Sequence, residues 1–271
     1  RDKLVTGVQT CALPISRRGR VVPPGPHGTA APRPLETLER VLSKAGVCSR
    51  TEAREWIRAG RVSVDGRTVT DPDCWVDLER ARVRIDGARL QARDRMYLLL
   101  HKPTGYLTTY KDPQGRPTVY DLLDGVDTFV SPVGRLDRDT SGLLLLTNDT
   151  QFAERVTNPE SHVPKTYVVY PSVALTDAQL QRLRDGLDLS DGPTRPAAVV
   201  RRPTVDHPAR FEITISEGRN RQVRRMVEAL GAAVLALTRV AIGPVRLGDT
   251  PPGTWRPLTP REVDALRGHR P

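Results

Sequence analysis

The sequence predicts an α+β or mixed α/β protein with a small N-terminal unit and a larger second domain. Between residues 38 and 90, two helical patterns are followed by two Asp-Gly turn phrases, which suits one compact unit. Beyond residue 95, apolar runs typical of strands interleave with helical patterns, without the regular spacing of repeated βαβ units. With 271 residues, 38% of them hydrophobic, the chain can build one large domain or two.

The first 34 residues are expected to lie outside both folded units. Residues 5–15, VTGVQTCALPI, resemble the translation of a common sequencing-adapter oligonucleotide, so we interpret residues 1 to about 16 as an artefact. The chain does not begin with Met, and we therefore expect its natural start to be missing. A signal peptide fits less well, because no uninterrupted apolar core precedes the following arginines. Residues 17–34 are rich in Arg and Pro and predict a disordered basic tail.

Charge and cysteine content narrow the class of protein. Lys and Arg outnumber Asp and Glu by 42 to 32, which gives a net charge of +10 and favours a polyanionic partner such as nucleic acid. A general compositional bias or a solvated basic surface would explain the same excess. No window reaches the 18 or so apolar residues of a membrane span, so we expect no membrane partner. Cys11, Cys48 and Cys74 form no CxxC pair, which suggests a reducing, cytoplasmic location without structural zinc. We take a monomer as the default.

The N-terminal unit is predicted to begin with two helices. Apolar residues recur at helical spacing over residues 38–45, and Gly46 ends that pattern. Ser49 and Glu52 have the Ser-x-x-Glu spacing of a capping box, which opens a second helix that stops at Gly60.

Two hairpins should follow, and the helices preceding them are basic. The phrases RVSVDGRTV, from Arg61, and RVRIDGARL, from Arg82, alternate apolar and polar residues up to an Asp-Gly pair, a strong hairpin signal. An ordinary solvated face is the alternative interpretation, but so many cations with few acids favour RNA binding. The cations are Arg40, Lys44, Arg50, Arg54, Arg58 and Arg61.

A second domain should begin after the polar run that ends at Arg95. Its apolar and periodic segments give strands near 96–101, 143–147, 166–170, 211–216 and 234–240, and helices near 149–157, 176–185 and 219–230.

The charged stretch VGRLDRDTSG, residues 133–142, lies directly before a run of four leucines. Turn residues flank the charges on both sides, so they should lie on a loop fixed by rigid structure, where catalytic groups are often mounted. A carboxylate near arginines stays ionised and can act as nucleophile or base. Asp137 and Asp139 could instead form a metal site, a glycosidase pair or a salt-bridged structural loop, and the local sequence leaves these open.

The stretch EGRNRQVRRMVEALG, residues 217–231, is the second unusual feature. Four arginines crowd the start of a predicted helix, where the helix dipole favours anions. The arrangement makes sense if an anion occupies the site, either an RNA phosphate or the carboxylate of Asp137. A solvated helix face is the alternative. The arginines are Arg219, Arg221, Arg224 and Arg225.

Residues 38–66, LERVLSKAGVCSRTEAREWIRAGRVSVDG, resemble the small RNA-binding domain first recognised in ribosomal protein S-four. The resemblance implies an RNA-binding domain over residues 35–92. It also implies phosphate contacts by Arg50, Arg54, Arg58 and Arg61.

Four further motifs occur in a fixed order: HKPTGYLTT from His101, VGRLDRDTSGLLLLTND from Val133, KTYVV from Lys165 and EGRNRQVRRM from Glu217. Together they resemble the RNA pseudouridine synthases, in the branch that modifies ribosomal RNA and carries an N-terminal S-four-type domain. The resemblance implies a catalytic domain over residues 95–271, built on a mixed, mainly antiparallel sheet flanked by helices.

This resemblance assigns roles to five residues of the second domain. Asp137 would be the nucleophile, and Arg224 the arginine that pairs with it. Tyr167 would pack against the flipped base and move a proton on the sugar, while Val223 would lie under the uracil. Arg135 would fill the RNA stack or hold a phosphate. Further RNA contacts would come from Arg219, Arg221 and Arg225.

Two other motif residues would be structural. Lys102 matches the first motif of the family, whose role is structural. Asp139 has no role in the family, and we expect it to cap the turn or to pair with an arginine. Isomerisation exchanges one glycosidic bond for another without redox change, so we expect neither cofactor nor metal. The expected substrate is large-subunit (23S) ribosomal RNA. A small-subunit (16S) enzyme, a non-catalytic RNA-binding or ribosome-assembly factor and a metal-dependent nuclease are the alternatives.

Overall fold

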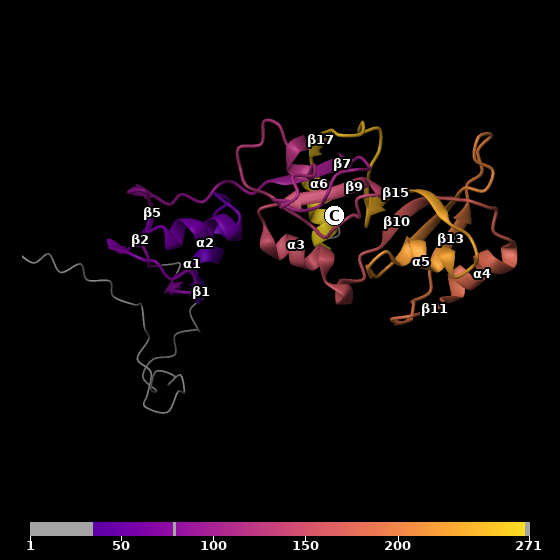
Figure 1. The fold of residues 1–271 in the computed structure, drawn as a ribbon, viewed down its shortest axis with the longest axis horizontal. Helices are drawn as coiled ribbons and strands as arrows, with labels where there is room; N and C mark the ends of the chain where they lie inside the picture. Colours follow the sequence, from indigo (N-terminus) through magenta and orange to yellow (C-terminus); the bar gives the residue numbers. More distant parts are fainter. Residues whose placement is uncertain (1–34, 78–79, 269–271) are drawn as a thin grey trace, which may run out of the picture. The chain divides into compact units, whose positions relative to one another are not determined.

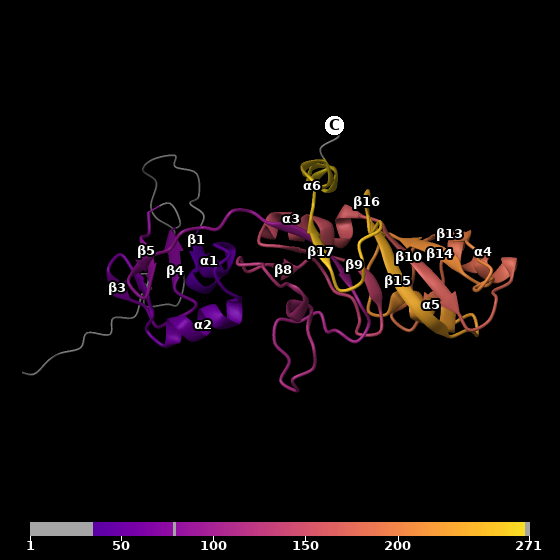
Figure 2. The ribbon, with the colours of Figure 1, turned by 90° about the horizontal axis from the view of Figure 1, so that it is seen from above.

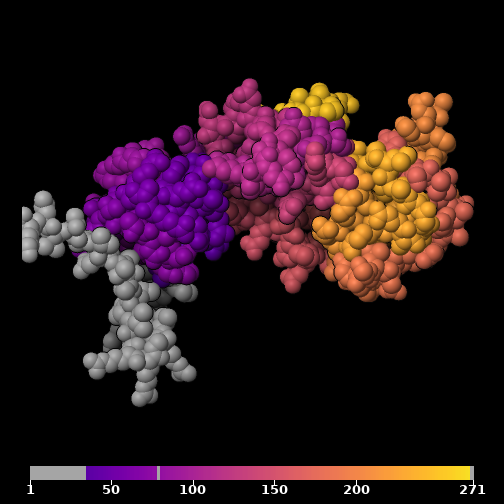
Figure 3. All heavy atoms as spheres, viewed as in Figure 1, coloured from indigo at the N-terminus to yellow at the C-terminus, as the bar shows by residue number. Residues whose placement is uncertain are grey.

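The computed structural model describes residues 35–77 and 80–268, and it divides the chain into two compact units between Asp94 and Arg95. The elements of each unit can be followed in the ribbon and in the space-filling view (Figure 1, Figure 3). The artefact and tail predicted for residues 1–34 lie outside the described residues. No helix within the described ranges is long and apolar enough to cross a membrane.

The N-terminal unit contains the two predicted helices and the two Asp-Gly hairpins. Ser49 and Glu52 form the predicted capping box at the start of the second helix. Asp65 and Gly66 both have positive φ, 51° and 82°, as a tight hairpin turn requires. A four-stranded antiparallel sheet, order β3-β2-β5-β6, packs under the helices, and β1 pairs with β4. The elements are β1 (Leu35–Thr37), α1 (Leu38–Lys44), α2 (Arg50–Arg58), β2 (Val62–Val64), β3 (Arg67–Thr68), β4 (Trp75–Asp77), β5 (Val83–Ile85) and β6 (Ala88–Arg89).

A nine-stranded sheet organises the second unit, with its main path in the order β13-β14-β10-β15-β9-β7-β17. Every pairing in it is antiparallel except that of β15 with β9, so the prediction of a mixed, mainly antiparallel sheet is confirmed. Figure 2 shows β9, β15 and β10 side by side. The strands are β7 (Tyr97–Lys102), β8 (Ser131–Pro132), β9 (Ser141–Thr147), β10 (Lys165–Pro171), β13 (Ala198–Arg201), β14 (Phe211–Ile215), β15 (Val234–Ile242), β16 (Val245–Arg246) and β17 (Trp255–Pro257).

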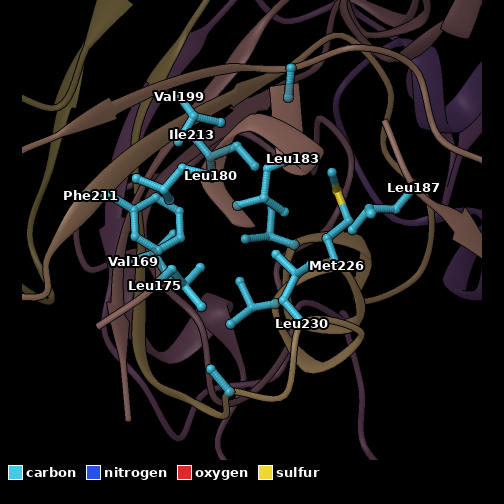
Figure 4. Close-up of a cluster of buried hydrophobic side chains, with 14 of the residues drawn as sticks. Val169, Leu175, Leu180, Leu183, Leu187, Val199, Phe211, Ile213, Met226 and Leu230 are labelled. Carbon is cyan, nitrogen blue, oxygen red and sulfur yellow. The ribbon is translucent and has the colours of Figure 1, made fainter. Parts of the chain in front are cut away.

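Helices and hydrophobic clusters cover both faces of this sheet. α4 (Asp177–Asp185) and α5 (Gln222–Glu228) pack on β10, β14 and β15, and Figure 4 shows side chains of this cluster, including Leu183, Ile213 and Met226. α3 (Thr150–Thr157) and α6 (Pro260–Arg267) cover β7 and β9. A short hairpin, β11 (Asp188–Leu189) with β12 (Gly192–Pro193), lies outside the sheet.

The four consecutive leucines of β9 are explained by burial on both faces. Leu143 and Leu145 face the cluster with α3 and α6, whereas Leu144 and Leu146 face a different cluster on the other side of the sheet. Because strand side chains alternate between faces, a strand covered on both sides becomes continuously apolar.

The parallel pairing of β9 with β15 holds the two halves of the sheet together. It comprises two residue pairs, Thr238 with Ser141 and Arg239 with Gly142. Gly142 has φ +108°, and a Cβ at this position would lie 2.2 Å from the carbonyl oxygen of Arg239. Glycine is therefore required at this close approach of two backbones.

Candidate active site

The loop that carries Asp137 connects β8 to β9, and these two strands pair with each other. Lys102, at the end of β7, holds the backbone of this loop in place. Its fully buried ammonium group donates hydrogen bonds to the carbonyl oxygens of Pro103 (3.1 Å), Asp137 (3.0 Å) and Thr140 (2.8 Å). Burial lowers the pKa of Lys102 to about 8. Lys102 thus has the structural role that the sequence motif implies.

The other carbonyl groups between residues 136 and 140 are bonded as well. The Thr108 hydroxyl donates to the carbonyl oxygen of Leu136 at 2.8 Å, and the backbone N–H of Gly105 donates to that of Arg138 at 2.7 Å. Arg224 donates to the carbonyl oxygen of Asp139 at 2.8 Å. Together with Lys102, these contacts bond every carbonyl from residue 136 to residue 140, so the loop backbone is held in one conformation.

The two carboxylates of the loop have different surroundings. Both Asp139 oxygens accept hydrogen bonds from Arg221, at 3.0 and 3.1 Å, and Arg224 Nε lies 3.3 Å from Oδ2. Burial raises the pKa of Asp139, but the hydrogen bond from Arg221 and the charge of Arg224 lower it more, so the net shift is downward. The Asp137 side chain is 34% exposed, lines a cavity and has Arg221 Nη1 at 3.9 Å from its Oδ2.

The ion pair between Arg224 and Asp137 that the resemblance implied is therefore wrong for this structure. Arg224 is 6% exposed and is held by the carbonyl oxygens of Val234 (3.0 Å) and Asp139 (2.8 Å), which direct it to the Asp139 carboxylate. Arg221 is the cation nearest to the Asp137 carboxylate. Asp139 has the arginine partner expected for it.

A paired-carboxylate metal site is not supported by this geometry. Both oxygens of Asp139 are directed at Arg221 instead of at a position shared with Asp137. In the part of the chain that the structure describes, no group of three or more His, Cys, Asp or Glu side chains could hold a metal ion.

Two of the four arginines in the arginine-rich stretch, Arg219 and Arg221, precede its helix, which begins at Gln222 instead of near residue 219. Arg221 has φ 48°, a left-handed conformation that delays the helix. Arg225 binds both oxygens of Asp191, at 2.8 and 2.9 Å, and Arg219 donates to the carbonyl oxygen of Gly192 at 2.8 Å. Within their own fold, the arginines of this stretch thus meet the carboxylates of Asp137, Asp139, Asp191 and Glu217.

A cavity of about 770 Å³ collects most of the predicted site residues of the second unit. Asp137 and Tyr167 line it, together with Val223, which is 3% exposed. Arg135, Arg219 and Arg221 also line it, whereas Arg224 and Arg225 do not.

Two basic residues of the cavity wall, Arg239 and Lys165, are among the lining residues that sequence reasoning did not assign to the site. Arg239, on β15, lies opposite Tyr167 of β10, and Lys165 is two positions before Tyr167 on the same strand. An arginine within the apolar strand ALTRVAI is the signal that could have identified the first of them.

In the N-terminal unit, three of the four predicted phosphate-binding arginines have acidic partners. Arg50 and Arg54 both bind the buried carboxylate of Glu39. Arg61 binds Asp86 at 2.6 Å and lies over the Trp56 ring. Arg58 is exposed and forms no ion pair among the described residues. Their contact with phosphate stays a prediction.

Comparison with known families defines the class of protein. Residues 36–73 match the S4 domain, which is the S-four-type unit, and residues 96–229 match the RNA pseudouridylate synthase model. The α+β fold and both domain types predicted from the sequence are thereby confirmed.

Individual relatives cover nearly the whole chain. It is 41% identical to an uncharacterized RNA pseudouridine synthase of Mycobacterium tuberculosis, over 89% of this chain and 96% of that relative. It is 38% identical to the ribosomal large subunit pseudouridine synthase B of Bacillus subtilis, over 86% of this chain and 96% of that relative. A crystal structure of a pseudouridylate synthase superposes with a TM-score of 0.61 at 32% identity, over 85% of this chain and 99% of that one. The chain belongs to the RNA pseudouridylate synthase family.

Proposed function

We propose that this enzyme converts a specific uridine of large-subunit (23S) ribosomal RNA to pseudouridine, with Asp137 as the nucleophile. The observation that carries the proposal is the state of the carboxylates in the cavity. Glu217 accepts hydrogen bonds from the Arg195 backbone and the Gln222 side chain. Among the described residues, the Asp137 carboxylate has only the 3.9 Å contact with Arg221, and the carbonyl groups of residues 136–140 around it are all bonded. The Asp137 carboxylate is therefore free to act as a nucleophile and lies on a rigid backbone.

The surroundings of Asp137 suit a nucleotide that has left its helix. A buried glycosidic carbon is accessible only after the nucleotide is flipped out. Tyr167 and Val223 line the cavity and would pack against the uracil. Arg135 is exposed beside Asp137 and would hold a phosphate or fill the gap in the stack.

In the proposed reaction, the C1′–N1 bond breaks and its electron pair stays with uracil. Either an Asp137 oxygen bonds to C1′, or C2′ loses a proton and a glycal forms, with Tyr167 positioned to move that proton. The uracil then rotates and C5 bonds to C1′. In the first route the bond between Asp137 and C1′ breaks at this step and frees the carboxylate, and in the second route C2′ regains its proton. Finally, C5 loses its proton and N1 gains one. One glycosidic bond replaces another, so the proposal assigns no cofactor or metal.

The large-subunit substrate is inferred from relatives in Bacillus subtilis and Salmonella typhimurium, both named ribosomal large subunit pseudouridine synthase B. RNA contacts by Arg50, Arg54, Arg58 and Arg61 are part of the same proposal, as are a monomeric state and a cytoplasmic location.

Replacement of the nucleophile tests the reaction. Asp137→Asn should abolish pseudouridine formation in transcribed large-subunit RNA and leave RNA binding intact. Asp206→Asn, at an exposed position outside the cavity, is the matched control and should stay active. Full activity of the Asp137 variant would overturn the assignment.

A second measurement separates the alternatives. Small-subunit RNA should remain unmodified, and modification there instead would identify the small-subunit enzyme. RNA binding without any pseudouridine would indicate a non-catalytic factor. Strand cleavage that a chelator stops would indicate a nuclease.

A further inference from the structure

Arg239 is a buried cation without a counterion in the wall of the cavity. It is 4% exposed, and its Nε donates to the carbonyl oxygen of Leu143 at 2.7 Å. Its Nη2 is buried and has no hydrogen-bond partner among the residues that the structure describes. A buried guanidinium without a counterion is destabilising unless an anion or acceptor arrives to bind it.

Lys165 is a second cation in the same wall. Burial lowers its pKa, and the charge of Arg239 lowers it further. Neither Lys165 nor Arg239 forms an ion pair among residues 35–77 and 80–268. Tyr167 lies between them in the register of the sheet, two positions after Lys165 on β10 and opposite Arg239 on β15.

The position of these two cations indicates which part of a nucleotide they would meet. Arg135, Arg195 and Arg221 also line the cavity, but they are exposed, as suits groups that reach RNA phosphates from the rim. Arg239 lies deep, in register with the tyrosine proposed to pack on the base. A base entering ahead of its sugar and phosphates would therefore bring its oxygens to Arg239.

We propose that Arg239, assisted by Lys165, stabilises the uracil anion formed when the C1′–N1 bond breaks. The inference rests on the proposed function and adds to it a charge-stabilising site for the detached base. The electron pair of the broken bond goes to N1 and is delocalised onto O2 and O4 of uracil. The Arg239 Nη2 group donates to one of these oxygens, and Lys165 adds its positive charge. When C5 bonds to C1′, the C5 proton is lost and N1 is protonated, which removes the negative charge.

The test measures glycosidic cleavage in single turnovers separately from RNA affinity. Arg239→Gln should slow cleavage about 10²-fold, the usual effect of removing one such donor, and leave the RNA dissociation constant unchanged. Lys165→Gln should slow it less. The Lys165 side chain is half-buried and forms no hydrogen bond or ion pair in the described part of the chain, so this variant keeps the test valid if Arg239→Gln fails to fold.

The basicity of the leaving base provides a second readout. RNA carrying 5-fluorouridine releases a less basic anion, because the fluorine withdraws electrons, and that anion needs less stabilisation. The defect of Arg239→Gln should therefore shrink on this substrate. Arg210→Gln is the matched control: Arg210 also has a buried Nε without a partner, but it does not line the cavity.

The outcomes are separable. Weaker RNA binding with an unchanged cleavage rate would assign Arg239 to a phosphate and overturn the inference, as would an equal defect on both substrates. If the unmodified enzyme forms no pseudouridine in any ribosomal RNA, it is the proposed function that fails.

Discussion

Replacing Lys102 by methionine should both destabilise the fold and misplace the nucleophile. The variant keeps the apolar stem of the side chain but removes three hydrogen bonds to carbonyl groups. The Asp137 carbonyl retains the Thr140 backbone N–H at 3.1 Å, whereas the Pro103 and Thr140 carbonyls lose a buried donor. At about 1–3 kcal/mol for each of the two orphaned groups, the loss is about 2–6 kcal/mol. That is a large part of the 5–15 or so kcal/mol that stabilises a typical domain.

Urea unfolding and pseudouridine formation measure the two effects of Lys102→Met. Lys111→Met, at an exposed lysine near Tyr110, is the control and should change neither. A loss of stability below about 1 kcal/mol together with full activity would refute the argument that Lys102 holds the loop.

The pKa of Lys102 predicts opposite trends for stability and activity in alkali. It is about 8 in the folded protein and 10.5 for an unperturbed lysine, so between these values the unfolded chain binds more protons. Stability should therefore rise with pH in this window through this group. Activity should fall, because a neutral amine has only two hydrogens for three carbonyl groups. Lys102→Met should lack the activity decline, measured as a pH–rate profile.

Two further predictions concern the same region. Asp139→Asn should lower the free energy of unfolding by about 1 kcal/mol at neutral pH. The loss is small because the Asp139 carboxylate that pairs with arginine is half-exposed. The folded pKa of Asp139 lies below its ordinary value of 3.8. The difference in unfolding free energy between the variant and the unmodified protein should therefore be constant above pH 3.8 and vanish as the pH falls through the folded pKa. Acid unfolding of both proteins measures this difference. Gly142→Ala should lower the free energy of unfolding by about 3 kcal/mol or more, because the Cβ of the new alanine would overlap the Arg239 backbone. Gly125→Ala, also at positive φ but with nothing within 4 Å, controls for strain, and equal thermal shifts for both would contradict the clash.

Local signals predicted the elements that depend on local chemistry. The capping box at Ser49 and the Asp-Gly turns satisfy their hydrogen bonds within a few residues, so the sequence displays them directly. The buried strands beginning at residues 97, 141 and 165 were evident from their apolar runs. β1 and β17 have three residues each, too few for a periodic pattern.

The pairing of charges inside the site could not be predicted, because it depends on contacts between distant elements. Arg221 adopts a left-handed conformation, and Arg224 is directed to Asp139 by the carbonyl of Val234. Neither follows from the order of residues in the motif. Sequence reasoning missed Arg239 because an arginine in a strand is typical of the edge of a sheet. Only the strand order shows that β15, which carries Arg239, lies between β10 and β9 in the interior of the sheet.

The fully bonded backbone of the loop around Asp137 determines which partner must adapt when RNA arrives. A carboxylate on such a support has little freedom to follow a substrate, so the distortion on binding falls on the nucleic acid. Uridines in mismatches, bulges and single strands are extruded more easily than those in stable helices. Because five peptide groups of this loop are fixed, the enzyme should prefer uridines in locally weak RNA structure. This preference requires no contact between the protein and a neighbouring base.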